Sequence, residues 1–220
     1  MGTMKDKSIV IIGGGASIKD GIALGLWDKL QQSKLDIASI NFAYMAMPFT
    51  PTYEVWLDTT FFRNNMDSLF VLEQKGCKMI TKVHSKYDNL PTIKKYAITR
   101  EKPDFSSDTM FVGMNGLSGF FALSIAVKQG YETIYLLGYD FGTNSINNTN
   151  THFYQDTLAV PSSGVRNPGV YLQHQGGVKK EVHGFDYYLS CKPKIFNVSP
   201  SSNINTFQKI DYPRLFELIA

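Results

Sequence analysis

Three consecutive glycines near the start of the chain, Gly13, Gly14 and Gly15, follow a short apolar run and precede Ser17. Residues without side chains let the backbone approach a ligand closely. The free N–H groups and the dipole of the helix that follows favour an anion. The turn therefore predicts a nucleotide site that uses these three glycines and Ser17. A tight strand-to-helix turn without a ligand is the alternative.

Two departures separate this turn from the known cofactor-binding motifs. A dinucleotide fingerprint has a third glycine, and an acid at the end of the second strand. Ile18 and Asn41 stand at those two positions here. A Walker loop also needs a Gly-Lys-Ser/Thr sequence, which does not follow the turn. These differences argue against NAD, FAD and a Walker loop, and they indicate a nucleotide held as a substrate.

Apolar runs alternate with helical patterns along most of the chain. Strands are expected at 9–12, 36–41, 53–58, 77–81, 96–98, 133–137 and 194–198, and helices at 17–32, 61–75, 116–129 and 212–219. This order predicts an α/β fold, a doubly wound, mostly parallel Rossmann-like sheet. Ligands bind such sheets beyond the carboxyl ends of the strands. We therefore expect Asn41, Asp58 and Asp140, which end or follow three of the strands, to lie at the same edge as the glycine turn.

One long stretch, residues 143–192, interrupts this pattern. It is rich in Asn, Gly, Ser and Pro, and three of the four histidines lie in it. A long segment without a regular pattern inside a compact domain is commonly a functional lid. We expect a single domain, with a nucleotide-binding core at 4–142, the lid at 143–192, and a last strand and helix at 193–220.

The composition limits the classes of partner. Of the 220 residues, 43% are hydrophobic and 19% are charged, as in a globular protein, and the net charge of +3 is too small to indicate nucleic acid binding. The uncharged stretch 109–127 approaches the length of a membrane span. Its polar residues and glycines indicate a buried strand, turn and helix instead. Two distant cysteines, Cys77 and Cys191, indicate reduced thiols and a cytoplasmic location.

Four segments resemble, in order, the bacterial sialyltransferases of glycosyltransferase family 42. They are the turn Ile-Ile-Gly-Gly-Gly-Ala-Ser-Ile-Lys (11–19), the second-strand segment 36–44, the Ser-Gly pair at 118–119 with the block at 126–141 that ends in Gly-Tyr-Asp-Phe, and the segment 194–202. The same framework is shared by a broader group of phage and bacterial Rossmann-like proteins. That group includes proteins similar to pterin pyrophosphokinases.

The resemblance implies a single Rossmann-like domain of the variant glycosyltransferase A type, with a mobile lid. It implies a nucleotide-sugar donor, CMP-sialic acid in the sialyltransferases, and a glycan acceptor. It further implies direct displacement at the anomeric carbon, no required metal or other cofactor, and assembly of several copies.

The resemblance also implies roles for individual residues. Asn41 and the glycine turn would hold the nucleotide, Ser118 would face the ligand from a helix N-terminus, and lid tyrosines such as Tyr154 would bind the donor phosphate. A lid histidine would be the general base on the acceptor hydroxyl, because the pKa of histidine lies near working pH. His174 falls nearest to the family's base, and His152 lies in a polar-aromatic cluster with Tyr154. Both histidines are therefore candidate catalytic residues.

The chain departs from the family most clearly at Gly14, where the sialyltransferases have Asn. The missing side chain removes one contact to the donor, so the donor sugar stays open. The lid segment 151–156 is more similar to the phage and bacterial relatives than to the sialyltransferases.

Two other functions stay open. An ATP-dependent pyrophosphokinase of the pterin type would need Mg²⁺, for which Asp58 and Asp140 are candidate ligands. Asp140 also has two interpretations of its own, a contact with the nucleotide and a cap on nearby backbone N–H groups. A non-catalytic accessory protein that kept a nucleotide- or sugar-binding pocket is the other alternative.

Overall fold

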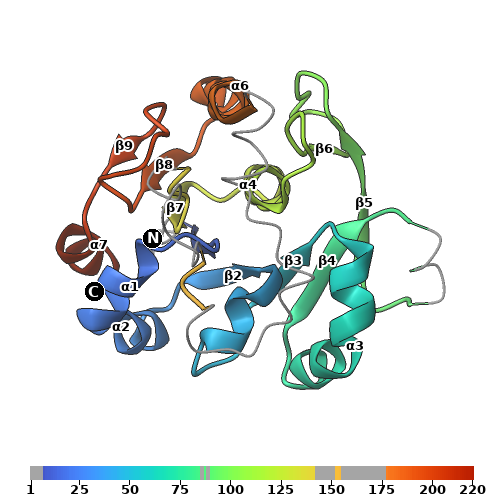
Figure 1. Ribbon diagram of the computed structural model, residues 1–220, viewed down its shortest axis with the longest axis horizontal. Helices are drawn as coiled ribbons and strands as arrows, with labels where there is room; N and C mark the ends of the chain where they lie inside the picture. The colour runs from blue at the N-terminus through green and yellow to red at the C-terminus, as the bar shows by residue number, and fades with distance from the viewer. Residues whose placement is uncertain (1–6, 85–86, 88–89, 142–151, 155–176) are drawn as a thin grey trace, which may run out of the picture.

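The computed structural model describes residues 7–84, 87, 90–141, 152–154 and 177–220, which form a sheet with helices on both faces (Figure 1). The strands are β1 (Ser8–Ile12), β2 (Asp36–Ile40), β3 (Tyr53–Trp56), β4 (Lys78–Lys82), β5 (Lys94–Thr99), β6 (Thr109–Phe111), β7 (Thr133–Leu137), β8 (Lys194–Asn197) and β9 (Gln208–Lys209). Within the described residues they form one sheet in the order β6-β5-β4-β3-β2-β1-β7-β8-β9, and each neighbouring pair is parallel. The predicted Rossmann-like α/β fold is confirmed.

The chain reverses its direction of travel across the sheet between β1 and β7. From β1 the strands follow one another outward to β6, and the chain then returns to pair β7 with the other side of β1. Such a reversal is the point at which open α/β sheets bind ligands. Strands buried on both faces are apolar without alternation, which explains why the runs Ile9-Val-Ile-Ile12 and Ile134-Tyr-Leu-Leu137 form β1 and β7, the two interior strands at the reversal.

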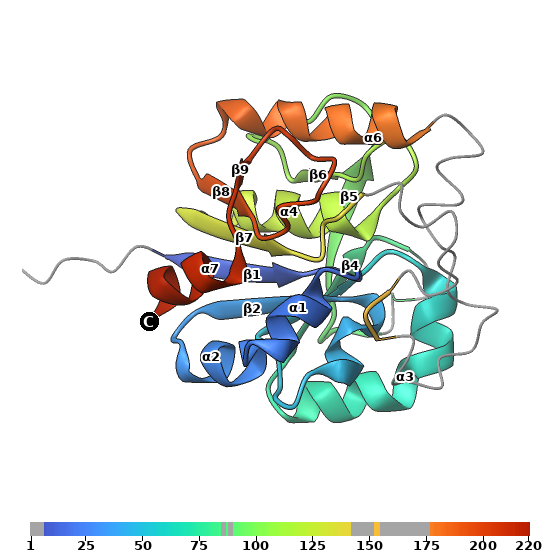
Figure 2. The same cartoon turned by 60° about the vertical axis from the view of Figure 1, so that its left-hand side comes forward.

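Two helical layers cover the sheet, as Figure 2 shows. One face carries α1 (Ile18–Ala23), α2 (Leu26–Gln32), α3 (Thr59–Gln74), α7 (Tyr212–Ile219) and the short helix η1 (Asn41–Ala46). The other face carries α4 (Ser118–Lys128), α6 (Gly177–Gly184) and the short helix η4 (Phe185–Ser190). Each layer buries its own apolar core against the sheet.

The expected single helix at 17–32 is two helices. Gly25 lies between α1 and α2 with a φ of 84°, in the left-handed region that glycine adopts readily. A glycine inside a helical pattern is tolerated in many helices, so the apolar spacing alone did not reveal the break. Ser17, the N-cap residue of α1, makes no side-chain capping hydrogen bond to the helix.

The end of the expected lid is regular structure that packs on the core. Residues 177–190 form α6 and η4, and the ring of Phe185 stacks on Phe120 of α4 at 4.2 Å. The Tyr188 hydroxyl lies 2.7 Å from the hydroxyl of Ser124. The two-residue strand β9 was not expected either. Residues 142–151 and 155–176, most of the expected lid, lie outside the described part of the chain.

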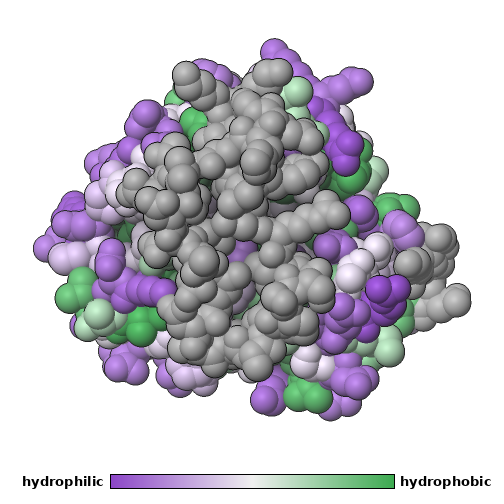
Figure 3. Space-filling model, viewed as in Figure 1, coloured by the Kyte–Doolittle hydropathy of each residue, from purple (hydrophilic) through white to green (hydrophobic). Residues whose placement is uncertain are grey.

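The surface drawn in Figure 3 is mostly hydrophilic where it is described, and apolar side chains form small separate groups on it. Among the described helices, none combines the length and the apolar character that a membrane crossing requires.

Candidate active site

The candidate site lies at the carboxyl edge of the sheet, around the point where the chain reverses. Ile12, the last residue of β1, pairs with Ser39 of β2 on one side and with Leu137 of β7 on the other. The glycine turn that follows β1 therefore lies between Asn41, which follows β2, and Asp140, which follows β7. The strand-end rule placed these residues correctly.

The glycine turn packs tightly against the end of β7. Gly13 donates its backbone N–H to the carbonyl of Leu137 at 2.8 Å, and Gly15 donates to the carbonyl of Gly138 at 3.0 Å. A Cβ atom on Gly15 would lie 2.5 Å from the Oδ2 atom of Asp140. The same Cβ atom would lie 2.6 Å from the backbone carbonyl oxygen of Gly138, so only glycine fits at position 15.

Asp140 occupies the start of α1. Its Oδ1 accepts a hydrogen bond from the Ser17 hydroxyl at 2.5 Å, and its Oδ2 accepts one from the Ser17 backbone N–H at 2.9 Å. The N–H groups of Gly13, Gly15 and Ser17, expected to be free for a phosphate, therefore donate within the protein. A carboxylate already faces the helix start, and α1 has only six residues. Of the two interpretations of Asp140, the capping role is the one that the geometry displays.

The loop after β8 holds the Asp140 corner in place. Ser202 donates its hydroxyl to the carbonyl of Tyr139 at 2.6 Å, and Asn203 donates its backbone N–H to the carbonyl of Asp140 at 3.0 Å. The Asn203 side chain donates to the carbonyl of Phe141 at 2.7 Å, where the backbone turns with a φ of 46°. Neither Ser202 nor Asn203 was expected to support the site, since both lie about 60 residues along the chain from the corner.

Asn41 was expected to end the second strand, but it is the first residue of η1. Its φ is 54°, in the left-handed region, which asparagine tolerates better than most non-glycine residues. Its side-chain Oδ1 is buried and has no hydrogen-bond partner among the described residues. The amide thus offers an acceptor at the edge where a ligand is expected.

Glu54 of β3 is a buried carboxyl group beneath this edge that was missed in the sequence. Its side chain is fully buried, and its Oε2 is hydrogen-bonded to the Ser39 hydroxyl. Burial raises the pKa of Glu54 well above its usual range, although the neighbouring Ser39 hydroxyl and Asn41 backbone N–H oppose the shift. The signal was a single carboxylate in the otherwise apolar sequence Tyr-Glu-Val-Trp, which resembles ordinary strand alternation.

The described segment 152–154 lies across the glycine turn. His152 forms an isolated antiparallel bridge with Gly15, and Phe153 donates its backbone N–H to the carbonyl of Gly14 at 2.9 Å. The His152 ring stacks on Tyr154 with the centroids 5.1 Å apart. Burial lowers the pKa of His152, so its imidazole is neutral at pH 7.

Tyr154 packs into the apolar layer beneath the segment. Its side chain is buried at 3% exposure, against Phe42 at a centroid distance of 6.1 Å and Phe153 at 5.1 Å. Burial, and to a lesser degree the charge of Glu54, raises the pKa of the Tyr154 hydroxyl. Tyr154, which the resemblance implied would bind the donor phosphate, is thus packed in the core together with Phe153.

Ser118 is the first residue of α4, whose eleven residues start at the same edge of the sheet. Leu117, the N-cap residue, precedes it in an extended conformation and makes no side-chain capping hydrogen bond among the described residues. The Tyr139 hydroxyl donates to the carbonyl of Gly119 at 3.0 Å and ties this first turn to the end of β7. The expected position of Ser118 at a helix start is confirmed.

Asp58 does not join this group. Its Oδ1 accepts the backbone N–H of Thr60 at 2.7 Å and caps α3. Three strand spacings, from β3 through β2 and β1 to β7, separate it from Asp140, a distance of about 14 Å. The two carboxylates therefore do not bind one Mg²⁺ ion. Within the described residues, no group of three or more His, Cys, Asp or Glu side chains has the arrangement of a metal site.

The remaining histidine candidates do not add to the site. His174 lies outside the described residues. His183 is exposed on α6, and its Nδ1 lies 3.3 Å from Asp186.

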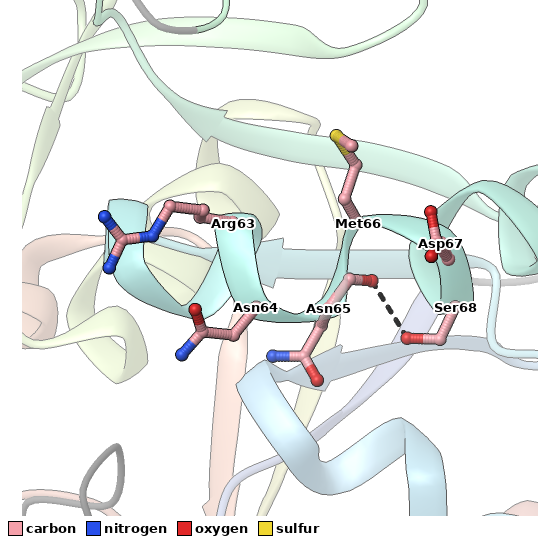
Figure 4. Close-up of a pocket in the computed structure, with 6 residues that line it drawn as sticks. All are labelled: Arg63, Asn64, Asn65, Met66, Asp67 and Ser68. Carbon is pink, nitrogen blue, oxygen red and sulfur yellow. Dashed lines mark hydrogen bonds between the residues drawn. The ribbon is translucent and has the colours of Figure 1, made fainter.

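A surface hollow along α3 also contains no residue of the candidate site. Six consecutive residues, 63–68, line it. Figure 4 shows their side chains around a single helix, with a hydrogen bond of 2.9 Å from the Ser68 hydroxyl to the carbonyl of Asn65. Consecutive residues of one helix point in different directions, so this hollow does not bring functional groups together.

An open parallel sheet with a glycine turn at its reversal point defines a Rossmann-like α/β fold. The sialyltransferase CstII from Campylobacter jejuni, in complex with the substrate analogue CMP-3FNeuAc, is similar with a TM-score of 0.54 and 14% identity, over 93% of this chain and 86% of that one. CstII in complex with a trisaccharide acceptor and CMP gives a TM-score of 0.56 and 13% identity over the same shares.

The Maf glycosyltransferase from Magnetospirillum magneticum AMB-1 is similar over 97% of this chain, with a TM-score of 0.60 and 18% identity. This chain spans 35% of that enzyme's length. No protein-family model matches the sequence, and no curated protein matches it. At these identities the likeness establishes the fold.

Proposed function

We propose that the protein is a nucleotide-sugar-dependent glycosyltransferase, most similar to a sialyltransferase. One observation carries the proposal: the glycine turn, Asn41, Asp140 and the start of α4 meet at the reversal point, and His152 lies across the turn. The fold shared with CstII and the Maf glycosyltransferase supports the same class.

The turn is proposed to bind the nucleoside part of the donor. The Asp140 carboxylate repels a phosphate but accepts hydrogen bonds from ribose hydroxyls. The Asn41 amide offers a second polar contact beside it. The donor phosphate is placed at the start of α4, where the helix dipole and uncapped N–H groups favour an anion. Ser118 adds a hydroxyl there.

His152 is proposed as the general base on the acceptor, with His174 as the second candidate. The neutral imidazole of His152 accepts the proton of a glycan hydroxyl while the oxygen of that hydroxyl attacks the anomeric carbon of the donor sugar. The bond from the anomeric carbon to the phosphate oxygen breaks, and the nucleotide leaves with its negative charge. This scheme uses no metal ion. Cys77 and Cys191 are free thiols, in keeping with the cytoplasmic location that the proposal includes.

Thermal unfolding with a panel of CMP, CDP, UDP, GDP and ATP with Mg²⁺ tests the proposal. Stabilisation by a nucleotide, CMP first, is expected, because a ligand that binds only the folded state raises the melting temperature. Donor turnover unchanged by EDTA supports a metal-independent transferase. No stabilisation by any member of the panel overturns the proposal, and stabilisation by ATP alone with a strict Mg²⁺ requirement favours a pyrophosphokinase.

A further inference from the structure

A carboxyl group lies inside the apolar layer beneath the candidate site. Glu54 has no exposed surface, and its side chain lies on the sheet face that also holds Phe42 and Tyr154. Ser39 supplies a hydrogen bond to Oε2, whereas Oε1 has no hydrogen-bond partner among the described residues. Tyr44 is a near neighbour. Burial and, to a lesser degree, the charge of Glu54 raise the pKa of the Tyr44 hydroxyl to about 12.

The stability of the fold does not explain this carboxyl group. A buried carboxyl group costs free energy even when it is partly hydrogen-bonded, and an apolar side chain of similar volume is commonly neutral or stabilising in its place. The neighbouring positions of β3, Val55 and Trp56, are apolar and buried. A leucine at position 54 would continue that pattern.

A second unfavourable feature lies next to it. Asn41 adopts a left-handed φ of 54°, and its Oδ1 is buried without a partner among the described residues. Ser39, which pairs with Glu54 across the sheet and is hydrogen-bonded to its carboxyl group, lies two residues before Asn41, and the Asn41 backbone N–H lies near enough to Glu54 to oppose the rise of its pKa. Strained backbone and unsatisfied polar groups concentrate at functional sites, where the surrounding structure holds them in place. Here both features meet beside the glycine turn.

We propose that Glu54 is a positioning residue of the nucleotide site: its carboxyl group, fixed by Ser39, holds the Asn41 backbone in the conformation that presents the Asn41 side-chain amide to the ligand. The group that Asn41 Oδ1 would accept from is a hydroxyl or an amine of the nucleoside. This inference rests on the proposed nucleotide site and names a residue that supports it from below.

The test compares Glu54→Leu with Glu54→Gln, with CMP as the probe in calorimetric titration. Glu54→Leu is expected to fold, to melt at or above the wild-type temperature, and to bind CMP about tenfold more weakly, since one ligand hydrogen bond is misplaced. Glutamine keeps an acceptor for the Asn41 N–H and a partner for Ser39, so Glu54→Gln is expected to retain CMP affinity. Val55→Ala, in the same strand but facing the opposite core, is the matched control: it lowers stability and leaves CMP affinity unchanged.

A second comparison uses Asn41→Gly, which accepts the left-handed backbone without strain. In that background Glu54→Leu is expected to cause no further loss of affinity. A full additional tenfold loss there, or an equal loss in Glu54→Gln, overturns the proposal, because Glu54 would then act through something other than Asn41.

Hydrogen exchange of the ligand-free protein keeps this inference separate from the proposed function. Glu54→Leu is expected to speed amide exchange at 41–46, and Glu54→Gln is not. If the wild type binds no nucleotide, the proposed function fails, and faster exchange in Glu54→Leu alone still supports the positioning of Asn41. Unchanged exchange in Glu54→Leu overturns the positioning role whether or not CMP binds.

Discussion

The imidazole of His152 lies over the α-carbon of Gly14, so that a Cβ atom on Gly14 would stand 2.6 Å from His152 Nδ1. Real Cβ atoms do not approach a ring nitrogen so closely. The absence of a side chain at position 14 therefore has a structural reason: it leaves room for a histidine from a segment almost 140 residues further along the chain. Gly14 and His152 form a matched pair at the glycine turn.

Gly14→Ala is expected to displace the segment 152–154 from the turn. The methyl group meets the ring of His152, and the Phe153-to-Gly14 hydrogen bond is lost or lengthened. We expect CMP affinity and transferase activity to fall about tenfold, with a smaller loss of stability. In a His152→Ala background the methyl group has space, so Gly14→Ala is expected to cost little more. Equal losses in both backgrounds, measured by titration, would show that the clash with His152 is not the cause.

The stability of the protein is expected to fall below pH 7 in a way that depends on His152. Burial lowers the pKa of the folded-state imidazole below its ordinary value of 6.5. As the pH falls through about 6.5, the unfolded chain binds a proton that the folded protein does not, so the free energy of unfolding decreases. Urea unfolding between pH 8 and pH 5 should show a shallower decrease in His152→Gln. Parallel pH profiles for the two proteins would contradict the buried neutral imidazole.

Much of the fold could be predicted because its signals are local. Uninterrupted apolar runs identify β1 and β7 as strands buried on both faces, and Gly76 and Gly130, with φ values of 94° and 74°, end the helices before them. The strand-end rule then brings the glycine turn, Asn41 and Asp140 to one edge. The break at Gly25 and the two-residue β9 have no comparable local signal.

The chemistry of the edge could not be predicted in the same way, because it depends on contacts between distant residues. The sequence from 13 to 17 indicates free N–H groups, and only the fold shows that Asp140, 123 residues away from Ser17, takes one of them. Glu54 and Ser39 look like ordinary polar positions until the sheet buries both. The burial of Tyr154 depends likewise on Phe42, which lies far from it in the chain.

Asp140→Asn distinguishes a nucleoside from a phosphate at the glycine turn. If ribose hydroxyls bind the carboxylate, the substitution weakens CMP and cytidine by the same factor, about tenfold, because both share the ribose. If a phosphate binds there, removing the charge strengthens CMP binding and leaves cytidine unchanged. Asp104→Asn is a matched control. Asp104 also accepts hydrogen bonds from a serine hydroxyl and backbone N–H, those of Ser106 at 2.6 and 2.9 Å, both on Oδ1 and on an exposed loop.

Ser118→Ala tests the other half of the same assignment. The hydroxyl at the start of α4 is proposed to bind the donor phosphate, so its loss should weaken CMP about threefold to tenfold while cytidine binds as before. Salt should weaken CMP more than cytidine in the wild type, since it screens the attraction of the phosphate to the helix start. Cytidine serves as the internal control in both titrations. Equal losses of affinity for CMP and cytidine in Ser118→Ala would contradict a phosphate site at the start of α4. If Asp140→Asn also bound CMP more strongly, the phosphate would be assigned to the glycine turn instead.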